Sequence, residues 1–243
     1  MAHETFIHHK KGADKVVLFI HGFLGSPEHF EKFIESTPDN VSVYNILLEG
    51  HGGSVRDFAR ASMKKWKAQV DSVVSELCEK YGEIIIVAHS MGTFFAMESA
   101  IKYPDKVKKL MLLQTPLKIG VKKEATINTI KSLFNLFPDD KVAKAYKESH
   151  SVELTFRFWE YIGWIPRYIE LFKESKLARD TILRLLVPCY IFQAKNDELV
   201  SLKSVKYIPQ NTFIALNILE NSAHFIYSEE NFLKMKNCFL KLL

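Results

Sequence analysis

Six short runs of apolar residues mark the first and last parts of the chain. They cover residues 16–20, 41–48, 84–88, 110–113, 190–194 and 213–219. Their apolarity is continuous rather than alternating, which is typical of strands covered on both faces in a parallel sheet. Helical periodicity fills residues 63–81, 92–103 and 225–243. Strands and helices therefore alternate, which predicts an α/β fold with a mostly parallel, doubly wound sheet.

The alternation breaks once, between Pro116 and about Leu186, where the pattern shows helices and turns but no strand. We expect residues 117–186 to form a helical cap inserted into a core made of residues 1–116 and 187–243. The insertion is rich in aromatic residues, namely Phe134, Phe137, Tyr146, Phe156, Phe158, Trp159, Tyr161, Trp164, Tyr168 and Phe172. Buried aromatic side chains usually serve packing. In a group of this size we nevertheless expect some to face a substrate, with Phe158, Trp159 and Trp164 as candidates.

Composition narrows the class of protein. The 243 residues are 47% apolar, which is enough for one sizeable core. The net charge of +5 comes from scattered lysines, not from the clustered basic stripe of a nucleic-acid binder. No segment reaches the roughly 18 continuous apolar residues of a membrane span. Three widely spaced cysteines do not suggest a disulfide framework, so we expect a cytoplasmic monomer or homodimer that acts on a small molecule without stable membrane insertion.

Ser90 stands in the strongest chemical motif, at the centre of the pentapeptide from Ala88 to Gly92. It directly follows a predicted buried strand and directly precedes a predicted helix. A sharp strand-to-helix turn exposes a serine hydroxyl, and the small residues Ala88 and Gly92 let strand and helix approach closely. We therefore interpret Ser90 as a nucleophile.

A serine nucleophile needs donors for the oxyanion that its attack creates. Residues 21–25, His-Gly-Phe-Leu-Gly, follow the first strong strand and form a glycine-rich turn that can aim a main-chain amide at the serine. The amides of Phe23 and Met91 are the expected oxyanion-hole donors. His21 precedes the turn, and we interpret it as a hydrogen-bonded structural residue.

The acid and the base are expected downstream, in the order serine, acid, histidine. Asp197 follows the strand at residues 190–194, and His224 follows the strand that ends at Leu219 and opens the last predicted helix. Loops at the carboxyl ends of parallel strands share one edge of the sheet, so Ser90, Asp197 and His224 can converge. Glu198 is the rival acid, and we prefer Asp197.

Other histidines suggest lesser roles. His89 adjoins the serine, but a packing role is expected because its side chain projects differently at a sharp turn. His51 lies on a glycine-rich loop and either lines the mouth of a substrate pocket or serves only the turn. The remaining histidines have no partners at metal-ligand spacing, so we expect neither a metal nor a cofactor.

Taken together, the segments 21–25, 50–52, 89–92, 196–200 and 223–225 resemble the α/β-hydrolase superfamily over essentially the whole chain. Within it, the pattern is similar to the carboxylesterase and monoacylglycerol-lipase branch, whose members carry a helical cap after the sixth strand. The resemblance implies an α/β-hydrolase fold, a triad of Ser90, Asp197 and His224, and oxyanion donors at Phe23 and Met91. Ala88 and Glu49 stand where many members have glycine and proline.

These features predict a serine hydrolase that cleaves carboxylic esters through an acyl-enzyme on Ser90. The ester would carry a short- to medium-chain acyl group or resemble a monoacylglycerol. The same residues could act on a thioester, an amide or a carbon–carbon bond. A relative that binds ligand without turnover is a further alternative.

Overall fold

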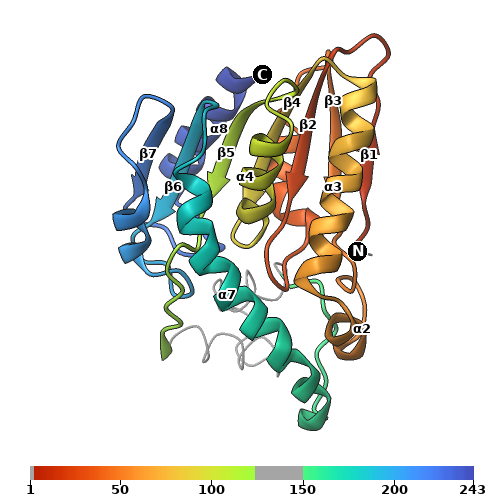
Figure 1. The fold of residues 1–243 in the computed structure, drawn as a ribbon, viewed down its shortest axis with the longest axis vertical. Helices are drawn as coiled ribbons and strands as arrows, with labels where there is room; N and C mark the ends of the chain where they lie inside the picture. The colour runs from red at the N-terminus through yellow and green to blue at the C-terminus, as the bar shows by residue number, and fades with distance from the viewer. Residues whose placement is uncertain (1–2, 124–149) are drawn as a thin grey trace.

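A computed structural model describes residues 3–123 and 150–243, and one twisted sheet with helices on both faces forms its centre (Figure 1). Within the described residues the sheet has the order β1-β3-β2-β4-β5-β6-β7. The strands are β1 (Phe6–His8), β2 (Lys15–Ile20), β3 (Val41–Ile46), β4 (Glu83–His89), β5 (Val107–Leu113), β6 (Cys189–Ala194) and β7 (Ile214–Leu219). All neighbours pair in parallel except β1, which is antiparallel to β3. The predicted α/β class and mostly parallel sheet are confirmed.

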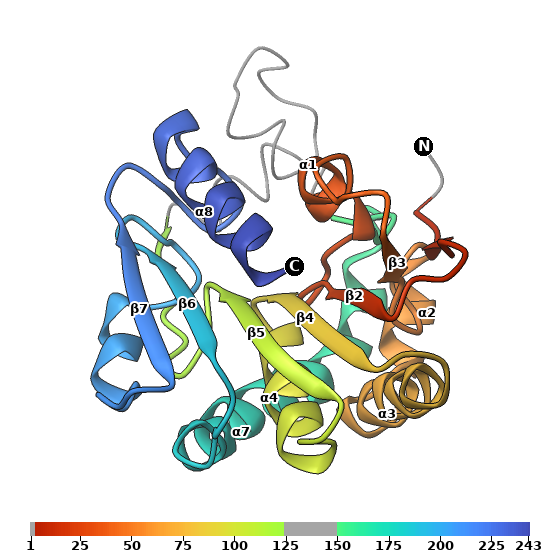
Figure 2. The same cartoon turned by 90° about the horizontal axis from the view of Figure 1, so that it is seen from above.

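Helices cover both faces of the sheet, as Figure 2 shows from above. The α-helices are α1 (Glu31–Ile34), α2 (Val55–Arg60), α3 (Met63–Lys80), α4 (Gly92–Lys102), α7 (Ile165–Ile182) and α8 (Glu229–Leu242). The 3-10 helices are η1 (Pro27–Phe30), η2 (Phe158–Trp164) and η3 (Leu202–Tyr207). One core lies between the sheet and α3, α4 and α7, and a second lies between the sheet and α1 and α8. The central strands are thus buried on both faces, which explains their continuous apolarity.

The structure differs from the sequence-based expectations at two places, an edge strand and the start of the last helix. The edge strand β1 was not predicted, because its residues are exposed and carry no continuous apolar run. The last helix begins at Glu229 instead of residue 225, because Ser228 is its N-cap and its side chain accepts a hydrogen bond from the amide of Asn231. His224 therefore lies on a loop and does not open the helix.

The inserted segment follows β5 directly and returns to the sheet at β6. Its described part holds η2 and α7 and contains no strand that pairs with the sheet. Helix α7 packs against α4 and α3, and the hydroxyl of its Ser175 donates to the carbonyl of Pro116 at 2.5 Å. The aromatic residues Phe134, Phe137 and Tyr146 lie outside the described residues. None of the described helices is both long and apolar enough to cross a membrane.

Candidate active site

Ser90 lies at the sharp turn between β4 and α4. Its φ of 51° is in the left-handed region, which costs energy for a residue with a side chain and persists only where surrounding contacts impose it. Those contacts are present: the Ser90 amide donates to the carbonyl of Leu113 at 2.8 Å, and its carbonyl accepts from the amide of Thr93 at 3.0 Å. The predicted strand, turn and helix around Ser90 are confirmed.

Two glycines make room for this turn. A methyl group on Gly92 would collide with the carbonyl oxygens of Ile20, at the end of β2, and of His21, which follows it. A methyl group on Gly22 would stand 2.7 Å from the Cβ atom of Ser90. Contacts that close are sterically forbidden, so the turn that begins at His21 packs directly against the serine only because it carries glycine.

The predicted acid and base are buried and in direct contact. His224 Nδ1 lies 2.8 Å from Asp197 Oδ2, and the two side chains are 2% and 0% exposed. The other oxygen of Asp197 accepts the amides of Leu199 at 2.8 Å and Val200 at 2.7 Å. The carboxylate is therefore fully engaged, and the imidazole is oriented with Nδ1 toward the acid and Nε2 available to another group.

The rival acid occupies a different position around the same histidine. Glu198 is 6% exposed, and its Oε2 accepts the main-chain amide of His224 at 3.2 Å. Asp197 thus contacts the imidazole ring, whereas Glu198 contacts the peptide. This geometry supports the preference for Asp197.

His89, the residue directly before Ser90, contacts the main chain and the ring of His224. Nε2–H of His89 donates to the carbonyl of His224 at 3.0 Å, and the two rings lie 4.7 Å apart. The described hydrogen bonds include none from the Ser90 hydroxyl to His224. Catalytic hydrogen bonds are often long or poorly aligned before substrate binds.

The predicted oxyanion turn has the expected shape. The amide of Gly25 donates to the carbonyl of Gly22 at 3.0 Å, and Leu24 has a φ of 57°. Within residues 3–123 and 150–243, the main-chain amides of Phe23 and Met91 have no hydrogen-bond acceptor. Met91 also stands at the N-terminus of α4, where the helix dipole favours negative charge.

His21 has the structural role expected from the sequence. Its Nε2 accepts the amide of Leu48 at 3.0 Å, and its Nδ1–H donates to the carbonyl of Gly22 at 3.0 Å. Burial lowers the pKa of His21 to about 4, which keeps the ring neutral. This arrangement requires both ring nitrogens and leaves neither for catalysis.

His51 lies inside an aromatic cluster with His21, Phe58 and Trp66. It is 6% exposed, and burial holds its pKa well below the usual range. Its Nδ1 lies 3.2 Å from the carbonyl of Leu48, while its Nε2 is buried and has no hydrogen-bond partner among the described residues. The same cluster supports the oxyanion turn, because the ring of Phe23 packs edge-on against Phe58 at 5.0 Å.

The three aromatic candidates of the insertion lie in different surroundings. Trp164 is 4% exposed, its Nε1–H donates to the carbonyl of Val55 at 2.8 Å, and its ring packs against Phe58. It therefore joins the insertion to α2. Phe158 and Trp159 are 78% and 54% exposed.

Sequence reasoning missed Gln114 and underestimated His89 and Glu198. Gln114 directly follows β5 with a φ of 53°, and its Oε1 accepts the amide of Ala194 at 2.7 Å. Leu24, Ser90 and Gln114 are the non-glycine residues with positive φ in the described chain. All three follow the carboxyl ends of strands, where strained residues commonly cluster at functional sites. The sequence offered no signal for Gln114. His89 and Glu198 could have been found because they adjoin Ser90 and Asp197 in the motifs.

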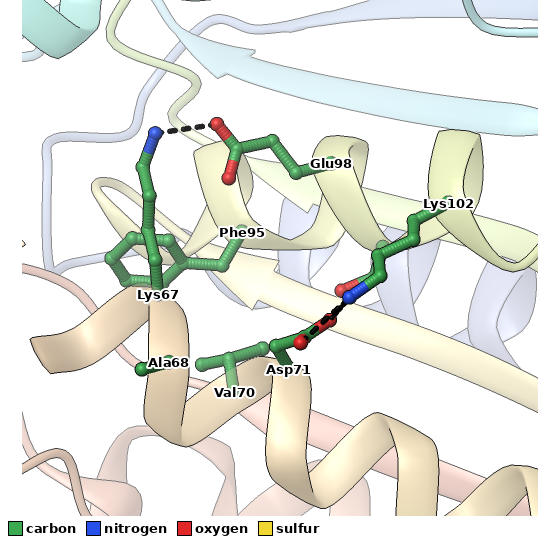
Figure 3. A pocket seen from close by; sticks show the side chains of 8 residues that line it. Lys67, Ala68, Val70, Asp71, Phe95, Glu98 and Lys102 are labelled. Carbon is green, nitrogen blue, oxygen red and sulfur yellow. Dashed lines mark hydrogen bonds and ion pairs between the residues drawn. The ribbon is translucent and has the colours of Figure 1, made fainter. Parts of the chain in front are cut away.

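A separate open cavity of about 280 Å³ lies between α3 and α4, away from the elbow (Figure 3). Lys67 and Lys102 line it beside their partners Glu98 and Asp71, each pair at 2.6 Å. Lys67 also lies 2.5 Å from Glu174 of α7. Lys67 of α3 thus contacts carboxylates of α4 and α7, and the cavity lies at a junction of these three helices.

Comparison with solved structures supports the same fold. The metagenome-derived lipolytic enzymes LipS and LipT are represented by a structure that matches with a TM-score of 0.76 over 99% of this chain and 97% of that chain, at 21% identity. A monoacylglycerol lipase from Paleococcus ferrophilus matches with a TM-score of 0.68 over 98% and 96% of the two chains, at 16% identity. At these identities the likeness shows the fold alone.

Curated relatives match over part of the chain. A 2-(acetamidomethylene)succinate hydrolase from Mesorhizobium japonicum is 25% identical over 56% of this chain and 49% of its own length. The Arabidopsis thaliana protein named probable lysophospholipase BODYGUARD 2 is 32% identical over 44% of this chain and 24% of its own length. The chain thus spans half or less of these relatives.

The family comparison covers the elbow and the oxyanion turn. The model of the serine aminopeptidase S33 family matches residues 11–158, more than half of the chain. This segment includes β2, the turn at residues 21–25, β4 with Ser90, and β5. The chain belongs to the serine aminopeptidase S33 family of α/β-hydrolases.

Proposed function

We propose that this protein is a serine hydrolase of the esterase and lipase type that cleaves carboxylic esters through an acyl-enzyme on Ser90. The buried 2.8 Å contact between His224 Nδ1 and Asp197 Oδ2, beside the strained turn at Ser90, carries the proposal. A buried carboxylate is costly to desolvate, and an oriented imidazole next to a nucleophile turn is the arrangement that acyl transfer requires.

The chemistry follows from these positions. Nε2 of His224 removes the proton of the Ser90 hydroxyl while Oγ attacks the ester carbonyl carbon, and Asp197 stabilises the imidazolium. The amides of Phe23 and Met91 donate to the oxyanion, a contribution worth roughly a hundredfold or more in rate for each donor. The intermediate collapses, and the departing alcohol takes the proton from His224. Water, deprotonated by His224, then releases the acid and restores Ser90.

The substrate class rests on the insertion and on the relatives. We propose that residues 117–186 form a cap over the core and that Phe158 and Trp159, both exposed aromatics, contact an apolar acyl group. We propose that Trp164 acts indirectly, by packing the insertion against α2. We propose that His51 also acts indirectly, because it packs in the aromatic cluster that supports Phe23. The lipolytic and monoacylglycerol-lipase neighbours favour short- to medium-chain or monoacylglycerol-like esters. A cytoplasmic monomer or homodimer remains our prediction.

The same residues suit other acyl compounds. The family description, serine aminopeptidase, favours an amide as the second candidate. A thioester or a carbon–carbon bond would use the same nucleophile and the same oxyanion donors.

The test is a hydrolysis profile over p-nitrophenyl esters of increasing chain length, a monoacylglycerol, a thioester and an aminoacyl-p-nitroanilide. We expect esters to be preferred, with a maximum at short to medium chain length. Ser90→Ala should abolish turnover and labelling by a fluorophosphonate probe. Turnover retained by that variant, or labelling of another residue, would refute the nucleophile, and preference for the anilide would favour the amide reaction.

A further inference from the structure

The main chain of His224 is held from both sides by groups outside the triad. Its amide donates to Oε2 of Glu198 at 3.2 Å, and its carbonyl accepts Nε2–H of His89 at 3.0 Å. All three residues are buried, at 2%, 6% and 1% exposure. Buried, satisfied polar contacts of this kind restrict geometry because the groups have no water to replace a lost partner.

These two residues have a particular place in the chain. His89 directly precedes the nucleophile Ser90, and Glu198 directly follows the acid Asp197. The residue next to Ser90 and the residue next to Asp197 therefore both contact the peptide of the base, His224.

The base needs such support because it lies on irregular backbone. His224 lies between the end of β7 at Leu219 and the start of α8 at Glu229, so no sheet or helix hydrogen bonding fixes its main chain. A local turn is present beside it, in which the amide of Ala223 donates to the carbonyl of Ile226 at 2.8 Å. Displacing a catalytic group by about 1 Å can cost roughly a hundredfold in rate.

His89 is itself restrained as a donor. Its ring lies 4.1 Å from the ring of His29 and 5.5 Å from that of Phe225. Burial, together with the neighbouring His29 and His224, lowers the pKa of His89 well below the usual range. The ring is thus neutral, and its contact with a carbonyl requires the proton on Nε2.

We propose that His89 and Glu198 are positioning residues that hold the peptide of His224 and thereby set the distance from the catalytic base to Ser90. This inference rests on the proposed function of Ser90 and His224. It predicts that loss of either contact lowers kcat and the rate of acylation while KM changes little, because the substrate is not touched.

The experiment uses two matched pairs of variants. His89→Gln places an amide N–H where Nε2–H of the imidazole stands, whereas His89→Leu removes the donor and keeps an apolar side chain. Glu198→Gln keeps an acceptor oxygen for the His224 amide, whereas Glu198→Leu removes it. Glu76→Leu, on the exposed face of α3, is the control. The readouts are kcat and KM for a p-nitrophenyl ester and the rate of fluorophosphonate labelling, each per active site counted by burst titration.

We expect the two leucine variants to lose about ten- to a hundredfold in kcat and in labelling rate, with KM within about threefold of the wild type. The two glutamine variants should recover most of that loss. Counting active sites removes any unfolded fraction from the comparison. If a leucine variant gives no folded protein, His89→Asn and Glu198→Ser, whose side chains are too short to reach the peptide, replace it.

Two results would overturn the inference. One is wild-type kcat per active site in a variant that lacks the contact. The other is an equal loss in the glutamine and leucine members of a pair, which would mean that packing or charge matters and the hydrogen bond does not. Failure of the proposed function is distinguishable, because Ser90→Ala would then retain turnover.

Discussion

His224 and Asp197 meet across a 2.8 Å contact between Nδ1 and Oδ2, although 26 residues and the strand β7 separate them in the chain. Both side chains are almost completely buried. The contact fixes the orientation of the imidazole, whereas Glu198 contacts the peptide of His224 and not its ring.

Replacing Asp197 by asparagine should preserve the fold and abolish most activity. The amide is isosteric, but its NH₂ group can force the imidazole into the wrong tautomer. We expect kcat for a p-nitrophenyl ester to fall by about 10³- to 10⁴-fold with KM little changed. Asp180→Asn, an exposed change on α7, is the matched control and should behave as the wild type. A loss below about tenfold would argue against Asp197 as the orienting acid.

Alanine at Gly22 should impair both folding and turnover. Its methyl group would stand 2.7 Å from Cβ of Ser90 and 3.3 Å from Oγ, so the turn or the elbow must move. We expect a loss of about 1–3 kcal/mol in the free energy of unfolding, measured in urea, and a fall in kcat. Gly12→Ala has no atom within 4 Å of the new methyl group and tests backbone strain alone, since Gly12 has a φ of 80°. Unchanged kcat in the Gly22 variant would contradict this packing.

Lys67 should stabilise the junction of three helices. Its Nζ lies 2.6 Å from Glu98 of α4 and 2.5 Å from Glu174 of α7, whose side chain is 9% exposed. Lys67→Met leaves that carboxylate without its partner, and we expect a loss of about 2 kcal/mol in urea unfolding. The double variant Lys67→Met, Glu174→Leu should recover part of the lost free energy of unfolding. Lys80→Met breaks an exposed pair with Glu76 and should leave the free energy of unfolding nearly unchanged. Equal losses at both lysines would disprove the role of Lys67.

Trp164 should matter to stability more than to substrate binding. Trp164→Phe keeps an aromatic ring in the cluster with Phe58 but removes the donor to the carbonyl of Val55. We expect about 1 kcal/mol of destabilisation with KM unchanged. Phe158→Ala, which alters a side chain that is 78% exposed, should leave the free energy of unfolding nearly unchanged and raise KM for apolar esters. The reverse pattern in the two variants would reverse the assignment of their roles.

Acid should destabilise the fold through its buried histidines. Burial lowers the pKa of His21 to about 4, and burial with the charge of His224 lowers that of His29 to about 3, from an ordinary value of 6.5. Below pH 6.5 the unfolded chain therefore binds protons that the folded chain does not. Stability is complete above pH 6.5 and falls as the pH drops toward 4, by about 3 kcal/mol for His21 alone.

Urea unfolding at pH 7.5, 6 and 5 measures this loss. His29→Phe should reduce the difference between pH 7.5 and 5 by at most about 2 kcal/mol, because Nε2 of His29 is buried although the residue as a whole is only half-buried. His8→Gln, an exposed change on β1, should leave the difference unaltered. Parallel curves for the wild type and the His29 variant would show that this histidine does not contribute.

The local pattern of apolar and polar residues was sufficient to predict the order of strands and helices. Continuous apolar runs marked the strands β2 to β7 within a few residues, and for the central strands burial on both faces explains that pattern. The elbow was predictable for a related reason, since Ser90 lies between a strand and a helix and needs a small residue at Gly92. The edge strand at Phe6–His8 was missed because its residues are exposed. The start of α8 was placed four residues too early because a capping serine, and not apolarity, decides where the helix begins.

Tertiary structure decided the relationships between residues far apart in the chain. Asp197 and Glu198 are adjacent, and only the approach of the loop after β7 assigned one to the ring of His224 and the other to its peptide. It likewise buried Trp164 while leaving Phe158 and Trp159 exposed on the same segment. The sequence by itself determined the α/β order and the chemical types at the strand ends, because these depend on local periodicity. Which atoms of those residues meet was decided by the tertiary structure, because a hydrogen bond depends on distances of a few tenths of an ångström that packing alone sets.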